Sequence, residues 1–153
     1  MTKRQLAALS ILLLPFVVEV EETHAADSYT CDLFFTGDVS IKGIPLANTT
    51  EKRSRGLSGP DSEFHVAKGM LFSWNDSNPR AFSMHDIHLP LSIGFLSDEG
   101  ILFSIEDMQA DSDKYYLSLL PASDAIELTF GQFEKVGLAI GSKLIHRECR
   151  ASD

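Results

Sequence analysis

The sequence predicts a β-rich α+β protein: a compact mixed or antiparallel sheet, or a partly closed barrel, with one or two short helices. Three observations support this class. Apolar and polar residues alternate over several short segments, as they do in half-buried strands. Clusters of Gly, Pro, Asn, Asp and Ser separate these segments and predict turns. Helical signals are confined to two short stretches, 48–56 and 132–136.

Residues 1–25 have the pattern of a secretory signal peptide. Lys3 and Arg4 precede an apolar stretch from Leu6 to Val18, and Thr23-His24-Ala25 supplies small residues for cleavage after Ala25. The alternative is an uncleaved anchor, but the apolar run is shorter than the roughly 20 residues of a membrane span. We therefore expect a periplasmic or secreted protein with one domain over 26–153 and no membrane span after cleavage.

The chain has 153 residues and a net charge of −9 at pH 7. This length is enough for one hydrophobic core without structural metals or several disulfides. The acidic balance argues against nucleic acid and anionic lipid as partners. We expect a monomer, and the sequence requires no cofactor.

Alternation over 29–35 predicts the first strand. Val39 and Ile41 begin a second strand, which we expect to break near Gly43 and Pro45. A short helix should follow, with Asn48 as its N-cap and Gly56 at its end.

Arg55 lies in the last turn of this helix, which has no apolar stripe. Two interpretations are open. Arg55 belongs to a solvated basic turn, or it reaches a carboxylate such as Glu127. Surface ion pairs are common and weak, which favours the solvated turn.

The stretch from Gly69 to Gly100 organises the chain. An apolar run at 70–72 predicts a buried strand, and 75–79 predicts a turn. Residues 81–88 resume as a strand, on which Phe82, Met84, Asp86 and His88 would share one face. Segments 91–96 and 101–106 then predict a hairpin around the turn at 97–100.

The remaining segments complete the sheet. Residues 107–114 should form a loop, 115–120 a short strand, 124–130 a strand, 132–136 a helical turn and 144–150 the last strand. On 124–130 we expect Ile126, Leu128 and Phe130 to face the core, which places Glu127 on the other face.

Short pieces of a signature run through the chain from about residue 38 to 146. They are Arg55-Gly56-Leu57, Gly69-Met70-Leu71-Phe72, Phe82-Ser83-Met84-His85-Asp86, Leu89-Pro90-Leu91-Ser92, and Ile126-Glu127-Leu128 followed by Gly131, with Tyr116, Ser118, Pro121 and Ala122 before the last of these. In order and spacing they resemble the bacterial and archaeal domain-of-unknown-function family 192. The resemblance implies a compact β-rich domain with a few short helices, and it implies no general activity.

This chain departs from the family in the middle of the signature. Ser83 replaces the family's Trp, His85 its Lys, Asp86 its Asn, Ile87 its Thr and Ser92 its Asp. Any activity that depends on those family residues is therefore not implied for this chain.

The candidate site lies on the 82–92 face. Candidate ligand-binding residues are Arg55, Met84, His85, Asp86, His88 and Glu127. Asp86 and His88 are candidate metal ligands, since Asp and His suit zinc and Met84 with His88 would suit copper. The alternative is a polar cluster at a sheet edge, because the spacing matches no recognised metal motif.

Two classes of function remain open. The first is a non-catalytic envelope domain that binds a small molecule or a protein partner through this face. The second is a metal-dependent or hydrolytic enzyme, with Ser83 or Ser92 as nucleophile and a His as base. No Gly-x-Ser-x-Gly motif is present. The sparse polar set favours binding.

Cys31 and Cys149 are the only cysteines. In an exported chain they are expected to form a disulfide, since secreted cysteines are usually paired. Both lie on strands near the ends of the domain, and domain termini are often close together. The alternative is two separate thiols, one of them pairing between chains.

Overall fold

The computed structural model describes residues 28–58 and 69–152. The predicted signal peptide lies outside these residues, and so does the segment 59–66, for which the sequence predicts a loop. The strands are β1 (Tyr29–Phe35), β2 (Val39–Ala47), β3 (Met70–Asn78), β4 (Ala81–Ser83), β5 (Leu91–Leu96), β6 (Leu102–Met108), β7 (Tyr115–Leu117), β8 (Ala122–Thr129) and β9 (Leu144–Ala151), and the helices are α1 (Thr50–Arg55) and α3 (Gln132–Val136). None of the helices in the described part of the chain is long and apolar enough to cross a membrane.

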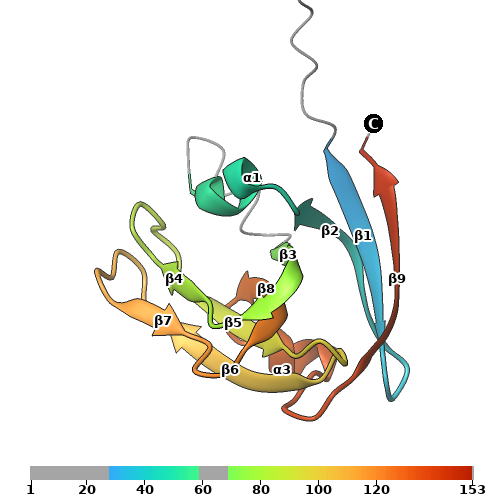
Figure 1. The fold of residues 1–153 in the computed structure, drawn as a ribbon. Coiled ribbons are helices and arrows are strands. Elements are labelled where there is room, and N and C mark those ends of the chain that lie inside the picture. The colour runs from blue at the N-terminus through green and yellow to red at the C-terminus, as the bar shows by residue number, and fades with distance from the viewer. Residues whose placement is uncertain (1–27, 59–68, 153) are drawn as a thin grey trace, which may run out of the picture.

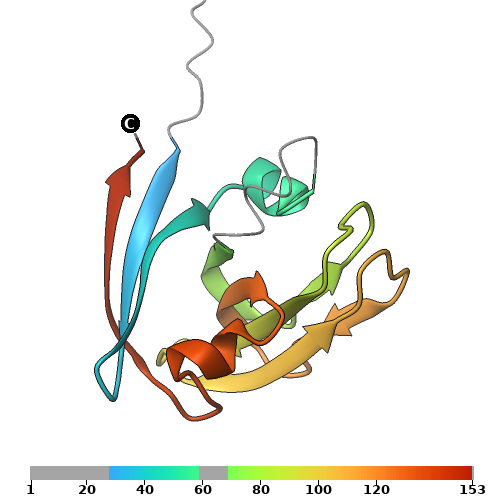
Figure 2. The same cartoon turned by 180° about the vertical axis from the view of Figure 1, so that it is seen from behind.

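Seven strands form one mixed sheet in the order β6-β5-β8-β3-β2-β1-β9, and β4 pairs with β7 in a separate ribbon. All neighbours are antiparallel except β2 and β3, which are parallel. The sheet curves strongly, so that β9 and β1 stand opposite β6 and β5 (Figures 1 and 2). It is not closed into a barrel, although an isolated β-bridge joins Ile101, just before β6, to Lys143, just before β9. The predicted β-rich class with two short helices is confirmed.

The central strands are buried on both faces. One core cluster contains Phe72, Ile93, Phe95 and Ala125, and the other contains Leu71, Leu96, Ile126 and Leu128. Because successive residues of a strand point to opposite sides, β3, β5 and β8 each supply both clusters. The hairpin of β5 and β6 is confirmed, and β5 is buried along its whole length.

Helix α3 packs closely on β5. A Cβ atom on Gly94 would lie 2.8 Å from ring carbons of Phe133 and 2.8 Å from Leu102 Cδ1. Only glycine therefore allows the Phe133 ring to approach the β5 backbone at this point. The helix ends at Gly137 in the left-handed region, with φ of 86°.

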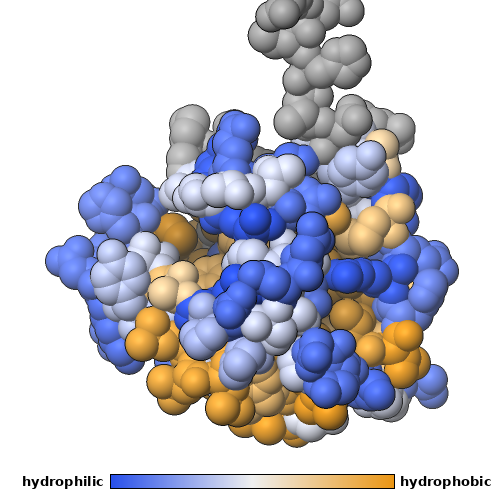
Figure 3. Space-filling model, in the orientation of Figure 1, coloured by the Kyte–Doolittle hydropathy of each residue, from blue (hydrophilic) through white to orange (hydrophobic). Residues whose placement is uncertain are grey.

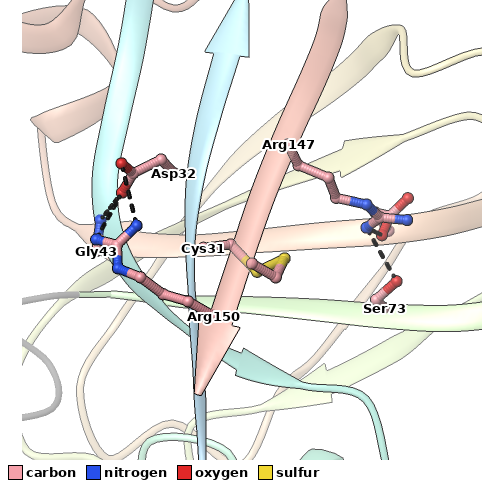
Figure 4. The surroundings of a disulfide bond; sticks show 8 residues. Cys31, Asp32, Gly43, Ser73, Arg147 and Arg150 are labelled. Atoms are coloured by element: carbon pink, nitrogen blue, oxygen red, sulfur yellow. Dashed lines mark hydrogen bonds and ion pairs between the residues drawn. A yellow bond between two sulfur atoms is a disulfide. The ribbon is translucent and has the colours of Figure 1, made fainter. Parts of the chain in front are cut away.

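The Cys31–Cys149 disulfide is present and joins β1 to β9 (Figure 4). The two cysteines face each other in the antiparallel register, with Cα atoms 4.0 Å apart. Tyr29 pairs with Ala151 in the same register, so the beginning of β1 and the end of β9 lie side by side (Figures 1 and 2). The expectation that the two ends of the domain lie close together is confirmed.

Strand β2 differs from the prediction, because it is not broken at Gly43 and Pro45. Gly43 has a positive φ of 64°, and the register against β1 shifts between Cys31 and Leu33. The Gly43 amide donates to Asp32 Oδ1 at 2.7 Å. The Asp32 side chain therefore stabilises a β-bulge at Gly43, and β2 continues beyond it.

Three further boundaries were predicted wrongly. The N-cap of α1 is Thr49 rather than Asn48, and its Oγ1 accepts a hydrogen bond from the Lys52 amide at 3.2 Å. Strand β3 continues through the turn expected at 75–79 as far as Asn78. Phe130 lies just beyond β8 and is 60% exposed instead of facing the core.

Candidate functional site

A pocket of about 530 Å³ lies between α1, β3 and β4, on one face of the central sheet. Its residues come from distant parts of the chain: Arg53, Arg55 and Gly56 from α1 and its end, Phe72 and Trp74 from β3, Phe82 from β4, His85 and Asp86 from the segment after β4, and Glu127 from β8. We call it the Glu127 pocket. In Figure 3 hydrophilic surface covers the α1 region, whereas hydrophobic surface gathers along the lower edge, below β6 and β7.

Glu127 is the buried acidic group of this pocket. It faces Met70 on β3 and Ile93 on β5 in the sheet register, so both lateral neighbours are apolar. The residue is only 2% exposed, and its Oε2 atom has no hydrogen-bond partner among the residues that the structure describes. Burial raises the pKa of the Glu127 carboxyl from its usual 4.5 to about 8. Burial therefore favours the neutral, protonated form of the Glu127 carboxyl.

Three aromatic rings form the apolar wall. Phe72 and Trp74 stack with ring centroids 6.4 Å apart and planes 21° apart. The Phe82 ring is nearly perpendicular to both, at 87° to Phe72 and 90° to Trp74, with centroid distances of 4.9 and 6.2 Å. The rings thus make a right-angled corner in the lining of the pocket that Glu127 also lines.

Helix α1 brings two arginines to the rim. Arg53 Nη1 donates to the Ser73 carbonyl at 2.8 Å, and its guanidinium lies 5.4 Å from the Trp74 ring centroid. Arg55 instead pairs with Glu51 at 2.8 Å, one turn earlier on the same helix. The described contacts include no pair between Arg55 and Glu127. The solvated interpretation of Arg55 is the one the structure supports.

The segment after β4 is not the strand predicted over 81–88. Pairing with β7 ends at Ser83, and Asp86 has a positive φ of 58°. The alternation is therefore lost. Met84 is completely buried in the core, whereas Asp86 and His88 are exposed.

Four of the six candidate ligand-binding residues line the Glu127 pocket: Arg55, His85, Asp86 and Glu127. Met84 and His88 are not part of the lining, and His88 Nδ1 lies 2.6 Å from Asp111 Oδ1. Sequence reasoning missed Arg53 and the three aromatic rings. The alternation of Met70, Phe72 and Trp74 could have found two of these rings, had the strand been extended past 72.

The two candidate nucleophiles, Ser83 and Ser92, lie apart, and only Ser83 lines the pocket. In the described ranges 28–58 and 69–152, no three His, Cys, Asp or Glu side chains gather so as to hold a metal ion. Ser92 faces Leu128 in the register, on the opposite side of the sheet from Glu127, and it donates to Asp107 at 2.7 Å. Ser83 and His85 do line the pocket.

Two solved structures share the fold. One is a proposed transcription regulator from Sinorhizobium meliloti 1021, with 22% identity, a TM-score of 0.63, and coverage of 80% of this chain and 93% of that chain. The other is a protein of unknown function from Novosphingobium aromaticivorans DSM 12444, with 20% identity, a TM-score of 0.62, and coverage of 78% and 83%. No curated protein matches the chain in sequence.

The family comparison agrees with the signature in the sequence. The model of the family described as Uncharacterized ACR, DUF192, matches residues 36–146, which is more than half of the chain. The pieces of the signature at 55–57, 69–72, 82–86 and 126–128 all lie inside this match, and residues from each of them line the Glu127 pocket. The chain belongs to the DUF192 family.

Proposed function

We propose that the chain is an exported, non-catalytic domain that binds a small molecule in the Glu127 pocket. The observation that carries this proposal is the Glu127 carboxyl, which lines the pocket and has an unpartnered, buried oxygen. A buried polar atom without a partner costs about 1–3 kcal/mol. A ligand that supplies the missing hydrogen bond would recover this cost.

The form of the pocket supports small-molecule binding rather than a flat protein contact. Its volume of about 530 Å³ lies within the usual range for ligand pockets. Phe72, Trp74 and Phe82 provide an apolar wall, and polar or charged side chains, among them Arg53, Arg55, His85, Asp86 and Glu127, form much of the rest of the lining. Such sites derive affinity from the apolar wall and orientation from the polar groups.

The binding test uses Trp74, which is the only tryptophan of the chain and lines the pocket. A library of small polar organic molecules is screened for changes in tryptophan fluorescence. Ligands of the pocket should bind Glu127→Gln and Asp86→Asn variants more weakly. His88→Ala is the matched control, since His88 lies outside the pocket and should not change affinity. Ligands that bind all variants equally would place the binding site elsewhere.

Export is supported by the signal pattern of residues 1–25 together with the Cys31–Cys149 disulfide. Disulfides persist mainly in oxidising compartments, so the pair suits a periplasmic or secreted protein. N-terminal sequencing of the protein from cell fractions tests this. The mature chain should begin near Ala26, whereas an intact Met1 in the cytoplasmic fraction would contradict export.

A second candidate is a hydrolase that uses the same pocket. Glu127 with its raised pKa could donate a proton, while the exposed carboxylate of Asp86 lines the same cavity. Pairs of carboxyl groups in such different environments serve as acid and base in known enzymes. Panels of chromogenic esters and glycosides test this candidate. Turnover that disappears in Glu127→Gln would favour it over simple binding.

A further inference from the structure

We propose that the ligand of the Glu127 pocket is an organic ammonium ion, with its charged group against Glu127 and its carbon body against the three aromatic rings. This inference rests on the proposed function and adds the chemical class of the ligand. Three features carry it: the isolated carboxyl, the aromatic corner and the charge of the rim.

Within residues 28–58 and 69–152, no cation pairs with the Glu127 carboxyl. Its lateral neighbours Met70 and Ile93 are apolar, and burial is the only cause of its displaced pKa. Any arginine close to the carboxyl would act in the opposite direction and lower the pKa. An ammonium group offers what is missing, namely a positive charge and up to three N–H donors.

The aromatic corner suits the same class of ligand. The faces of aromatic rings carry negative potential and attract cations, and ammonium ligands are commonly enclosed by several rings. Phe82 stands nearly perpendicular to both Phe72 and Trp74, and all three rings line the pocket. The guanidinium groups of Arg80 and Arg53 already lie 4.3 and 5.4 Å from the Trp74 ring centroid, so the proposal places the ligand's ammonium group at Glu127 and its carbon body against the rings.

The rim does not repel a cation as strongly as its two arginines suggest. Arg55 is paired with Glu51, whereas Arg53 donates to the neutral Ser73 carbonyl and keeps its positive charge. Asp86 adds an exposed carboxylate to the lining, and His85, also in the lining, lies with its Nε2 3.5 Å from Asp86 Oδ2. The chain as a whole has a net charge of −9, which raises the local concentration of cations.

Binding of an ammonium ion should release a proton. Glu127–COOH and R–NH₃⁺ combine to give the pair Glu127–COO⁻ and R–NH₃⁺, and one H⁺ leaves to solvent. Below the pKa of about 8, affinity should therefore rise about tenfold per pH unit, and above it the affinity should level off. A neutral ligand that accepts a hydrogen bond from the protonated acid would show the opposite trend, with affinity lost above that pH.

The test compares three probes of similar size: benzylammonium, benzyl alcohol and benzoate. Binding to the full mature chain is followed by Trp74 fluorescence at pH 6, 7 and 8, and proton release is measured by calorimetry in two buffers of different ionisation enthalpy. Benzylammonium should bind best, gain about tenfold in affinity from pH 6 to 7 and less from pH 7 to 8, and release about one proton at pH 6 and about half a proton at pH 8. In Glu127→Gln its affinity at pH 8 should fall at least about tenfold and the pH dependence should vanish, while the thermal midpoint confirms folding.

The outcomes separate the two proposals. If benzyl alcohol or benzoate binds in preference to benzylammonium, the ammonium class is overturned but small-molecule binding in the pocket stands. If benzylammonium binds wild type and Glu127→Gln equally, the assignment to Glu127 is overturned. If no probe changes Trp74 fluorescence, the ammonium inference fails, and the broader library screen then decides the proposed function separately.

Discussion

Arg147 Nη1 on β9 lies 2.9 Å from Asp124 Oδ1 on β8, although three strands separate β9 from β8 in the order of the sheet. The same nitrogen donates to Ser73 Oγ on β3 at 3.2 Å (Figure 4). The contact therefore joins the edge of the sheet to its centre across the concave side. It bridges the curved sheet between β9 at one edge and the central strands β3 and β8.

Replacing Arg147 by alanine should destabilise the protein. The Asp124 side chain is only 11% exposed, and loss of its cation would leave Oδ1 poorly satisfied. We expect a loss of about 1–3 kcal/mol in the free energy of unfolding, measured by urea denaturation. Arg150→Ala is the matched control, since its pair with Asp32 is more exposed and should contribute less than about 1 kcal/mol. Equal effects of the two substitutions would contradict the special role of Arg147.

The Glu127→Gln variant should change how stability depends on pH. The folded pKa of about 8 is raised above the usual 4.5, so folding binds a proton between these values. The stability that this proton provides is fully present below pH 4.5 and is lost as the pH rises to about 8. Wild type should lose about 1.4 kcal/mol per pH unit relative to Glu127→Gln in this window. Urea denaturation at pH 5 and pH 7 measures the difference, and parallel stability profiles would contradict the burial of the acid.

Gly94→Ala should destabilise the protein because its Cβ would overlap the Phe133 ring at 2.8 Å. Overpacking of this kind typically costs about 1–3 kcal/mol. The double variant Gly94→Ala with Phe133→Leu provides the control, since the smaller side chain relieves the overlap. The added methyl group of Gly94→Ala should lower stability less in the Phe133→Leu background than in wild type. Thermal unfolding of the four proteins completes the cycle, and an additive result would contradict the contact.

Reduction of the disulfide should lower the free energy of unfolding and leave the fold unchanged. Thiol titration of the unfolded, unreduced protein should find no free thiols, in agreement with the Cys31–Cys149 bond. Chain-entropy arguments give a stabilisation of up to about 5 kcal/mol for a sequence separation of 118 residues. Urea denaturation with and without reductant measures it. Two free thiols per chain, or a dimer that reductant dissolves, would contradict the intramolecular bond.

Local patterns predicted the elements whose structure depends on nearby residues. The hairpin of β5 and β6 has strict alternation and a glycine turn, and it forms as expected. The last strand and the disulfide were also predicted, since only one pairing of two cysteines exists. The N-terminal strand 29–35 agrees with β1 residue for residue.

The errors arose where distant contacts decide the backbone. Gly43 was expected to break β2, but the Asp32 side chain eleven residues away stabilises a bulge there. Alternation over 81–88 was expected to continue, but Asp86 adopts a positive φ and ends it. Residues of α1 and β4 lie around Glu127 on its face of β8. Alternation within β8 could not predict the burial of this face, because those residues are distant in the sequence.

The disulfide also makes almost the whole domain one covalent ring. A protease that cuts once in the connection between β6 and β7 would leave β1–β6 and β7–β9 joined through Cys31 and Cys149. Trp74 and Glu127 would then belong to different peptides and still be tethered to each other. Nicked protein would migrate as intact protein until it is reduced, so a loss of ligand binding could precede any visible loss of mass.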